Sequence, residues 1–210
     1  MGQKYIDIKN ILGIPILYTF FQKIISSEKG RKFVTENFIQ FDNGLSVLDL
    51  GCGPAFALKD IKHNIIYHGI DFQDDYIVSA KMKFKKSLYP DYDFILANVE
   101  EFDYGSLNTK FDRILLIGVL HHLSDDKIDK IFKNISCLLK PDGFVFCLEN
   151  TFVSDQSWFA RKLIEMDRGQ NVRTPEGYLY FFKKYFTEVK YEIRHDLLRV
   201  PYTHILITAK

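Results

Sequence analysis

Short apolar runs alternate with helical patterns through the middle of the chain. The apolar runs that predict strands cover residues 45–50, 65–70, 93–98, 111–118 and 143–149. Between them, residues 74–88 and 125–139 predict helices. Nearly continuous apolar strands that alternate with helices favour a parallel sheet covered on both faces.

Several of the predicted helices carry their own start and stop signals. Ser124 stands at the expected N-cap of the second helix, and "KPDG" at 140–143 predicts its end. Another helix is predicted to begin at Thr174, which is followed by Pro175 at the first helical position. Residues 20–41 also favour helices, so helical segments flank the strand-rich middle of the chain.

The C-terminal residues break this alternation. The apolar ranges 189–197 and 202–209 are separated only by "LRVP", which is too short for a crossover helix. They therefore predict an antiparallel hairpin formed by strands 6 and 7. The expected fold is α/β and Rossmann-like, a mostly parallel seven-stranded sheet with helices on both faces and this hairpin at its C-terminal edge.

Composition narrows the class of protein without changing the fold. Hydrophobic residues make up 47% of the 210 residues and charged residues 26%, which is typical of a globular domain. The net charge of +1 does not indicate a nucleic-acid-binding protein, which would be expected to be strongly basic. Three cysteines without a C-x-x-C pair fit a reducing cytoplasm. The apolar stretch 11–21 is too short to span a bilayer, which leaves peripheral membrane contact open.

The stretch "VLDLGCGPAF" at residues 47–56 places a carboxylate two residues before a glycine-rich turn. A dinucleotide-binding turn carries Gly or Ala where this chain has Phe56. The Asp49 carboxylate would repel a pyrophosphate and attract a cation, which disfavours a nicotinamide oxidoreductase. S-adenosylmethionine fits the turn because it brings an ammonium and a sulfonium.

"VLDLGCGPA" resembles the first motif of the class I S-adenosylmethionine-dependent methyltransferases, and the resemblance extends over about 45–150. It implies that S-adenosylmethionine is the cofactor and S-adenosylhomocysteine the product. It also implies that Asp71 binds the ribose, although Asp71 also suits a helix cap. The chain departs from the family in the short span after Gly53, which leaves room only for a short first helix. The cofactor-binding residues expected from the resemblance are Asp49, Gly51, Gly53, Asp71, Phe72, Asn98, Val99 and Gly118.

The resemblance points to two candidate catalytic residues. His121, in "LHHL" after the fourth strand, is expected to act as a base or an orienting group near the methyl. Glu149 ends the fifth strand, at the rim where acceptors bind. The structural alternatives are a packed or helix-capping histidine and a carboxylate that caps the next loop. No metal is expected, because no second carboxylate and asparagine follow the fourth strand at the required spacing.

Residues 150–188 are expected to form a helical lid over the acceptor. Within it, Asp167, Arg168, Gln170 and Arg173 are candidate acceptor-binding residues, since paired arginines suit a phosphate or carboxylate. The alternative is a polar turn between two helices. One domain, 1–210, then comprises a helical cap (1–44), a cofactor-binding core (45–149), the lid (150–188) and the terminal hairpin (189–210).

A small-molecule acceptor fits best, namely a sugar, a metabolite or a natural-product intermediate methylated on oxygen or nitrogen. "NPPY", which marks amino-group methylation of adenine or glutamine in the family, is absent. The alternative function is a non-catalytic S-adenosylmethionine-binding module that acts through a partner.

Overall fold

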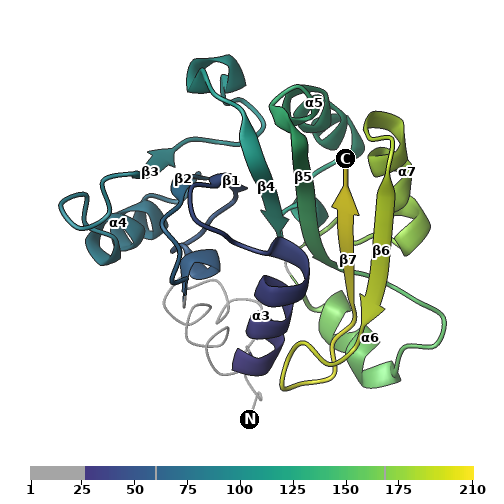
Figure 1. The fold of residues 1–210 in the computed structure, drawn as a ribbon. Helices are drawn as coiled ribbons and strands as arrows, with labels where there is room; N and C mark the ends of the chain where they lie inside the picture. The colour runs from purple at the N-terminus through teal and green to yellow at the C-terminus, as the bar shows by residue number, and fades with distance from the viewer. Residues whose placement is uncertain (1–26, 60, 168) are drawn as a thin grey trace, which may run out of the picture.

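A computed structural model describes residues 27–59, 61–167 and 169–210. Its centre is a seven-stranded sheet in the order β3-β2-β1-β4-β5-β7-β6 (Figure 1). The strands are β1 (Ser46–Leu50), β2 (Ile66–Asp71), β3 (Tyr92–Leu96), β4 (Phe111–Ile117), β5 (Leu139–Asn150), β6 (Val189–Arg194) and β7 (His204–Ala209).

The first five strands are parallel, and β7 pairs antiparallel with both β5 and β6. The predicted α/β sheet with a terminal antiparallel hairpin is therefore confirmed. The strands β1, β4 and β5 lie next to one another in the middle of the sheet. β1 is buried along its whole length, as expected for a central strand of a covered parallel sheet.

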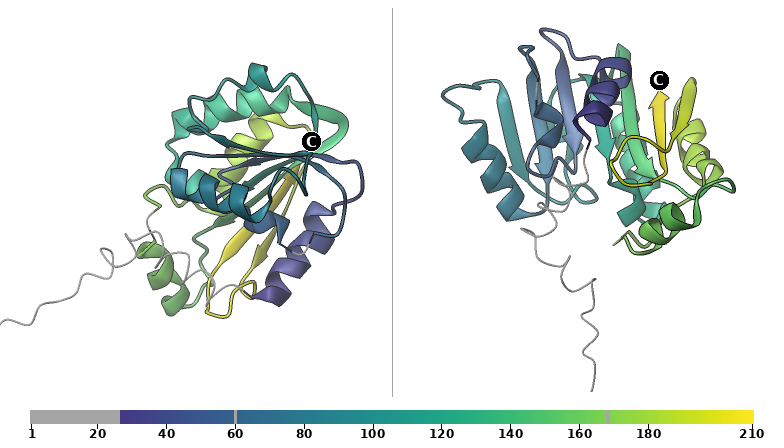
Figure 2. Two further views of the ribbon diagram at one scale, coloured as in Figure 1. Left: turned by 90° about the vertical axis from the view of Figure 1, so that its left-hand side faces the viewer. Right: turned by 90° about the horizontal axis from the view of Figure 1, so that it is seen from below.

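Helices cover both faces of this sheet (Figure 2). One core joins the sheet to α5 and α7, and a second joins it to α3, α4 and the short 3-10 helix η2. The described α-helices are α3 (Glu28–Val34), α4 (Asp74–Lys83), α5 (Asp125–Ser136), α6 (Trp158–Glu165) and α7 (Pro175–Tyr185). Short π and 3-10 turns are η1 (Thr35–Ile39), η2 (Phe56–Leu58), η3 (Tyr104–Leu107) and η4 (Leu120–His122).

The helix α5 shows how the sequence determines this packing. Four apolar residues at helical spacing are buried on one face: Ile128, Ile131, Phe132 and Ile135. Acidic residues in its first turn favour the positive end of the helix dipole. In α7, the predicted cap is confirmed, since the Thr174 hydroxyl accepts a hydrogen bond from the Gly177 N–H at 3.3 Å.

Several element ends differ from the prediction, and two of them have a clear physical reason. α4 ends at Lys83, because the Phe84 ring turns into an aromatic cluster 5.3 Å from Tyr89 and 5.7 Å from Tyr92. β5 begins at Leu139 and runs through residues 140–143, which were predicted to end a helix. Its register with β4 shifts after Leu139. The predicted N-terminal segment 11–21 lies outside the described residues.

The carboxyl ends of the parallel strands define one edge of the sheet, and α6 lies at this edge (Figure 1). Because β7 runs antiparallel, its first residue, His204, pairs with Asn150 at the end of β5. The connection from β6 to β7 therefore reaches the same edge as the loops that follow β1, β2 and β4. Within the described ranges, no helix is long and apolar enough to cross a membrane.

Candidate functional site

The turn after β1 adopts a backbone conformation that glycine favours. Gly51 has φ +72° and Gly53 has φ +54°. A Cβ at Gly51 would lie 2.5 Å from Val119 Cγ2, whereas a Cβ at Gly53 would meet no heavy atom within 4 Å. The turn is thus packed against the β4 loop on one side and open at Gly53.

Asp49 lies beneath this turn. Its side chain is buried, and the Tyr67 hydroxyl donates a 2.6 Å hydrogen bond to its Oδ2 atom. Burial raises the pKa of Asp49 to about 7, although the hydrogen bond from Tyr67 acts to lower it. A cation that reaches this carboxylate would favour its ionised form, so the site is suited to a positively charged group.

Asp71 links the end of β2 to the same turn. Its Oδ2 accepts a hydrogen bond from the Gly53 N–H, and its Oδ1 accepts one from the Gln73 N–H, both at 2.9 Å. The second bond lies at the start of α4, so the helix-cap interpretation describes part of what Asp71 does. Burial raises its pKa, and the backbone donors oppose the increase. A carboxylate has about four lone-pair sites, so these two bonds leave acceptor capacity for a ribose.

The remaining predicted cofactor residues are at the same sheet edge but differ in exposure. Phe72 is 70% exposed, as suits a ring that is to cover an adenine. The Asn98 side chain is exposed and accepts a hydrogen bond from the Glu100 N–H at 3.1 Å. Val99 is buried, and only its backbone could contact a ligand. Gly118 has φ +69°, and a Cβ there would meet only His121 Cε1, at 3.7 Å.

These features test whether S-adenosylmethionine fits. The backbone is open at both Gly53 and Gly118, at the ends of β1 and β4. Carboxylates of Asp49 and Asp71 lie close enough to influence each other's charge. An open glycine backbone beside two acids matches a ligand with ribose hydroxyls and positive charge, so the residues fit the cofactor.

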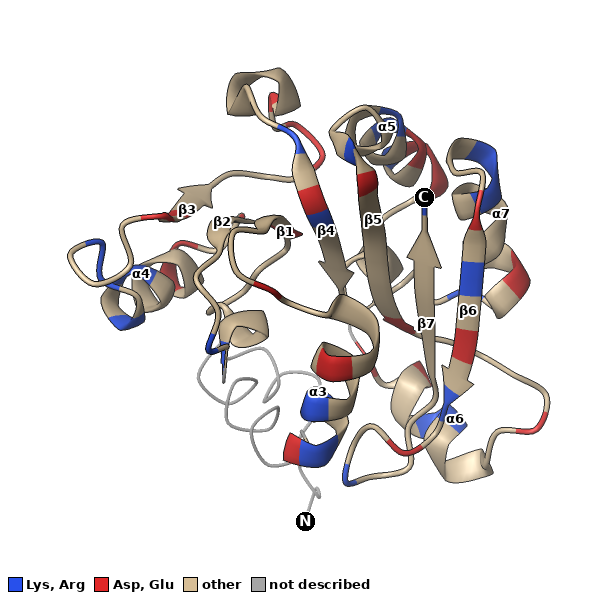
Figure 3. Cartoon of the chain, viewed as in Figure 1, with Lys and Arg blue, Asp and Glu red and all other residues tan. Residues whose placement is uncertain are grey.

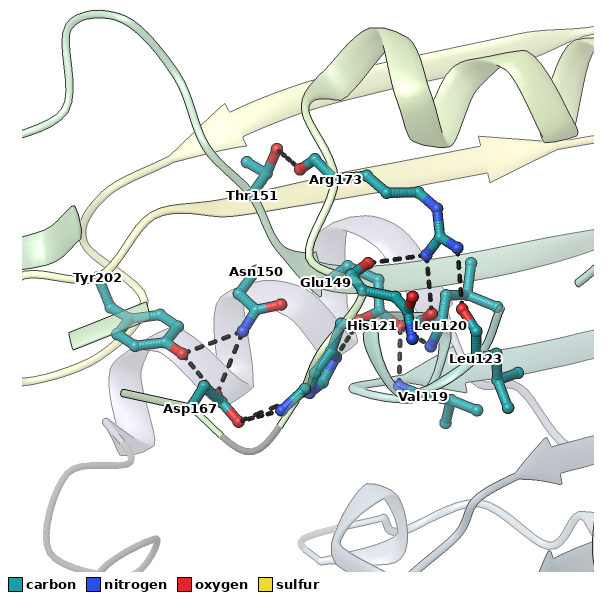
Figure 4. A network of polar contacts seen from close by, with 12 residues as sticks. Val119, Leu120, His121, Leu123, Glu149, Asn150, Thr151, Asp167, Arg173 and Tyr202 are labelled. Carbon is teal, nitrogen blue, oxygen red and sulfur yellow. Dashed lines mark hydrogen bonds and ion pairs between the residues drawn. The ribbon is translucent and has the colours of Figure 1, made fainter. Parts of the chain in front are cut away.

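His121 and Glu149 form a buried pair next to Gly118 (Figure 4). His121 Nδ1 lies 2.6 Å from Glu149 Oε2. The other carboxylate oxygen accepts hydrogen bonds from the Val119 and Leu120 N–H groups, at 2.8 and 2.7 Å. Glu149 is 1% exposed, so it lies beneath the β4 loop and not at the predicted rim, because it satisfies backbone donors there.

Burial acts to lower the pKa of His121, but the charge of Glu149, their hydrogen bond and the charge of Asp167 together raise it. The sign follows from the two carboxylates that face the ring. His121 is therefore held as a cation over a wider pH range than an ordinary histidine, which favours an orienting role over that of a free base.

Three of the four candidate acceptor residues lie within the described residues, and their settings differ. Asp167 faces His121, with Oδ1 3.8 Å from Nε2. Gln170 is exposed, and Arg168 lies outside the described residues. Arg173 is a correction, because its guanidinium binds the chain itself. It donates to the backbone oxygens of Leu120, Leu123 and Asn171, at 3.1, 2.8 and 2.8 Å, and it pairs with Asp125.

Two residues of the network were missed in the sequence. Asn150 and Tyr202 both donate to Asp167 Oδ2, at 3.2 and 2.7 Å (Figure 4). Tyr202 precedes β7 and Asn150 ends β5, so only the antiparallel pairing brings them together. Asn150 could have been predicted as a site residue, because it is polar and stands at the end of β5. Nothing local in the sequence distinguishes Tyr202.

Comparison with known proteins gives one family match. Residues 47–143 match the family model described as "Methyltransferase domain". This range runs from β1 into β5 and includes Asp49, Asp71 and His121.

The curated relatives to which this chain is similar include two bacterial enzymes. The cyclopropane-fatty-acyl-phospholipid synthase of Escherichia coli is 26% identical over 156 residues, covering 68% of this chain and 38% of the relative. The demethylmenaquinone methyltransferase of Lactococcus lactis is 31% identical over 114 residues, covering 51% and 43%. The chain thus spans about two fifths of the length of these relatives.

Phosphoethanolamine N-methyltransferase 2 of Haemonchus contortus, solved in complex with S-adenosyl-L-methionine, has the same fold. Its structure superposes with a TM-score of 0.73 and 13% identity, covering 100% of this chain and 61% of that one.

Proposed function

We propose that the chain is a class I S-adenosylmethionine-dependent methyltransferase and that it methylates a small-molecule acceptor. The cofactor is S-adenosylmethionine, and the product is S-adenosylhomocysteine. The acceptor atom is an oxygen or nitrogen of a sugar, a metabolite or a natural-product intermediate. The observation that carries the proposal is the open glycine turn after β1, which lies beside the Asp49 and Asp71 carboxylates.

In this proposal each residue at the sheet edge has a separate task. Asp71 holds the ribose hydroxyls, and Phe72 lies against the adenine. Asn98 and Val99 contact the adenine edge, with Val99 doing so through its backbone. The Gly51 and Gly53 turn lets the cofactor approach closely. The remaining two, Asp49 and Gly118, face the charged methionine end.

When bound, S-adenosylmethionine supplies a methyl group already activated by its sulfonium. The protein then has mainly to align the acceptor with that methyl group. His121 lies beside Gly118 and is held by Glu149, so we assign these two residues to orienting the acceptor. The segment 150–188 covers them, since Asn171 N–H donates to the His121 backbone oxygen at 2.9 Å, and this supports its role as a lid.

Several observations support a small acceptor. Figure 3 shows acidic and basic residues interspersed along α3, β6 and α7, where a nucleic-acid surface would favour a basic stripe.

The three free cysteines, two of them buried, fit a cytoplasmic protein. The names of the relatives indicate different acceptors, a fatty-acyl phospholipid and a demethylmenaquinone, so no single acceptor transfers to this chain.

The first test is a calorimetric titration of the full chain with S-adenosylhomocysteine and, separately, with NADH. We expect one site for S-adenosylhomocysteine and none for NADH. Binding of NADH instead would refute the proposal in favour of an oxidoreductase. A chain that binds S-adenosylhomocysteine but transfers no methyl group to any acceptor would support the alternative, a non-catalytic cofactor-binding module.

A further inference from the structure

A chain of charged groups runs from the interior to the sheet edge. Glu149 forms its inner end, with a fully buried side chain and hydrogen bonds to both oxygens. His121 follows, with its side chain 8% exposed. Asp167 forms the outer end, with 25% of its side chain exposed. Of these three groups, Asp167 is therefore the one that a ligand can reach.

Both nitrogens of the His121 ring face protein carboxylates. Nδ1 contacts Glu149, and Nε2 faces Asp167. Gly169 also packs directly on this ring, since a Cβ at Gly169 would overlap His121 Cδ2. The histidine is thus enclosed on the side where an acceptor would have to approach Nε2, and its influence passes through Asp167.

Asp167 is held in place by donors from separate segments. Tyr202 and Asn150 donate to Oδ2, at 2.7 and 3.2 Å, and the Gly169 N–H donates to Oδ1 at 3.3 Å. Three donors and an adjacent imidazole keep a partly exposed carboxylate in one orientation. Such a fixed carboxylate is suited to receive a hydrogen bond from a ligand.

Two buried polar atoms next to this carboxylate have no hydrogen-bond partner among the described residues. They are Asn150 Oδ1 and His204 Nδ1. Asn150 and His204 are paired across β5 and β7, and the His204 ring lies 5.1 Å from the Tyr202 ring. Buried polar atoms in native proteins are nearly always paired. Both atoms are closed to solvent, so they add to the polar surroundings of Asp167 but would not themselves contact a ligand.

From this geometry we propose that Asp167, held by Tyr202 and Asn150, contacts the acceptor and receives a hydrogen bond from it. His121 and Glu149 are positioning residues behind Asp167. This inference rests on the proposed function and narrows its substrate class. The acceptor carries a hydroxyl or amino group at this point, because the carboxylates of Asp167 and Glu149 would repel a phosphate or a carboxylate.

The test uses the full chain with Asp167→Asn, Tyr202→Phe and, as a matched control, Asp142→Asn. Asp142 is exposed and lies near the start of β5, at the opposite end of that strand from Asn150. Three quantities are measured: the affinity for S-adenosylhomocysteine, label transfer from methyl-labelled S-adenosylmethionine to a small-metabolite fraction of the host, and the His121 titration midpoint by NMR of histidine-labelled protein.

We expect Asp167→Asn to lower label transfer by about 10- to 150-fold and Tyr202→Phe by about tenfold. The affinity for S-adenosylhomocysteine should stay within about twofold of the wild type, since Asp167 is not at the cofactor turn. The His121 midpoint should fall in Asp167→Asn, because a facing negative charge is lost. Asp142→Asn should change none of these.

Wild-type label transfer in Asp167→Asn would overturn the assignment of acceptor contact. If the titration midpoint of His121 did not change in Asp167→Asn, the claim that His121 is a positioning residue facing the Asp167 carboxylate would be wrong. Failure of the proposed function is a distinct result, since the wild-type chain itself would then transfer no label, whether or not it binds S-adenosylhomocysteine.

Discussion

Replacing the buried Asp49 by asparagine tests the electrostatic basis of cofactor binding. Asparagine has nearly the same shape and can still accept the hydrogen bond that Tyr67 donates at 2.6 Å. The change therefore removes charge with little change in packing. Loss of a hydrogen bond to a charged group costs about 1.5–3 kcal/mol. The dissociation constant for S-adenosylhomocysteine should rise by about 10- to 150-fold, as measured by calorimetry at pH 7.5.

The pH dependence of the same affinity gives a second, sharper readout. The pKa of Asp49 is raised to about 7 by burial. Below that pH the carboxyl is protonated and must release its proton to pair with a cation. The affinity of the wild type should therefore fall by up to about tenfold per pH unit below pH 7. It should level off above pH 7, where the carboxylate is already ionised in the free protein.

The Asp49→Asn variant should show a flatter profile between about pH 5.5 and pH 7.5, on either side of the raised pKa of Asp49. Subtracting the two profiles separates Asp49 from Asp71, whose pKa is also raised by burial. Asp91→Asn, an exposed site at the far end of β3, is the matched control and should behave as the wild type. Equal affinities and equal slopes for Asp49→Asn and the wild type would refute this account of the turn.

Three other substitutions test the neighbouring structure. Tyr67→Phe removes the donor that lowers the pKa of Asp49, so the pH midpoint of S-adenosylhomocysteine binding should move upward; a downward shift would contradict this. Gly51→Ala should lower the free energy of unfolding in urea by about 1–3 kcal/mol more than Gly44→Ala, because both have positive φ but only Gly51 meets Val119. Arg173→Lys should lower it by about 1–3 kcal/mol, since a lysine cannot reach three carbonyls at once; an unchanged midpoint would show that these bonds contribute nothing.

Local signals in the sequence were sufficient for most of the sheet. The apolar runs predicted the strands because each central strand is buried on both faces, as in β1. The "LRVP" connection predicted the antiparallel hairpin because it is too short for the crossover helix that a parallel pair of strands needs. The start of β5 was missed because Pro141 and Gly143 favour a turn, while the structure accommodates them where the register with β4 shifts.

The candidate site was predictable where its residues follow strands directly. Asp49, Asp71 and the two glycines belong to one motif and lie together. The roles of Glu149 and Arg173 were not predictable, because their partners, Val119 and Leu120 for the first and Leu120 and Leu123 for the second, are 29 to 53 residues away along the chain. Long-range backbone partners leave no local pattern in a sequence.

The measurement that tests the central claim most directly is methyl transfer itself. The purified chain and methyl-labelled S-adenosylmethionine are incubated with separated host fractions of small metabolites, lipids and glycans, RNA, and protein. The account predicts label in a small compound that carries a hydroxyl or amino group. Label in RNA or protein alone, or no label in any fraction from a chain that binds S-adenosylhomocysteine, would contradict it.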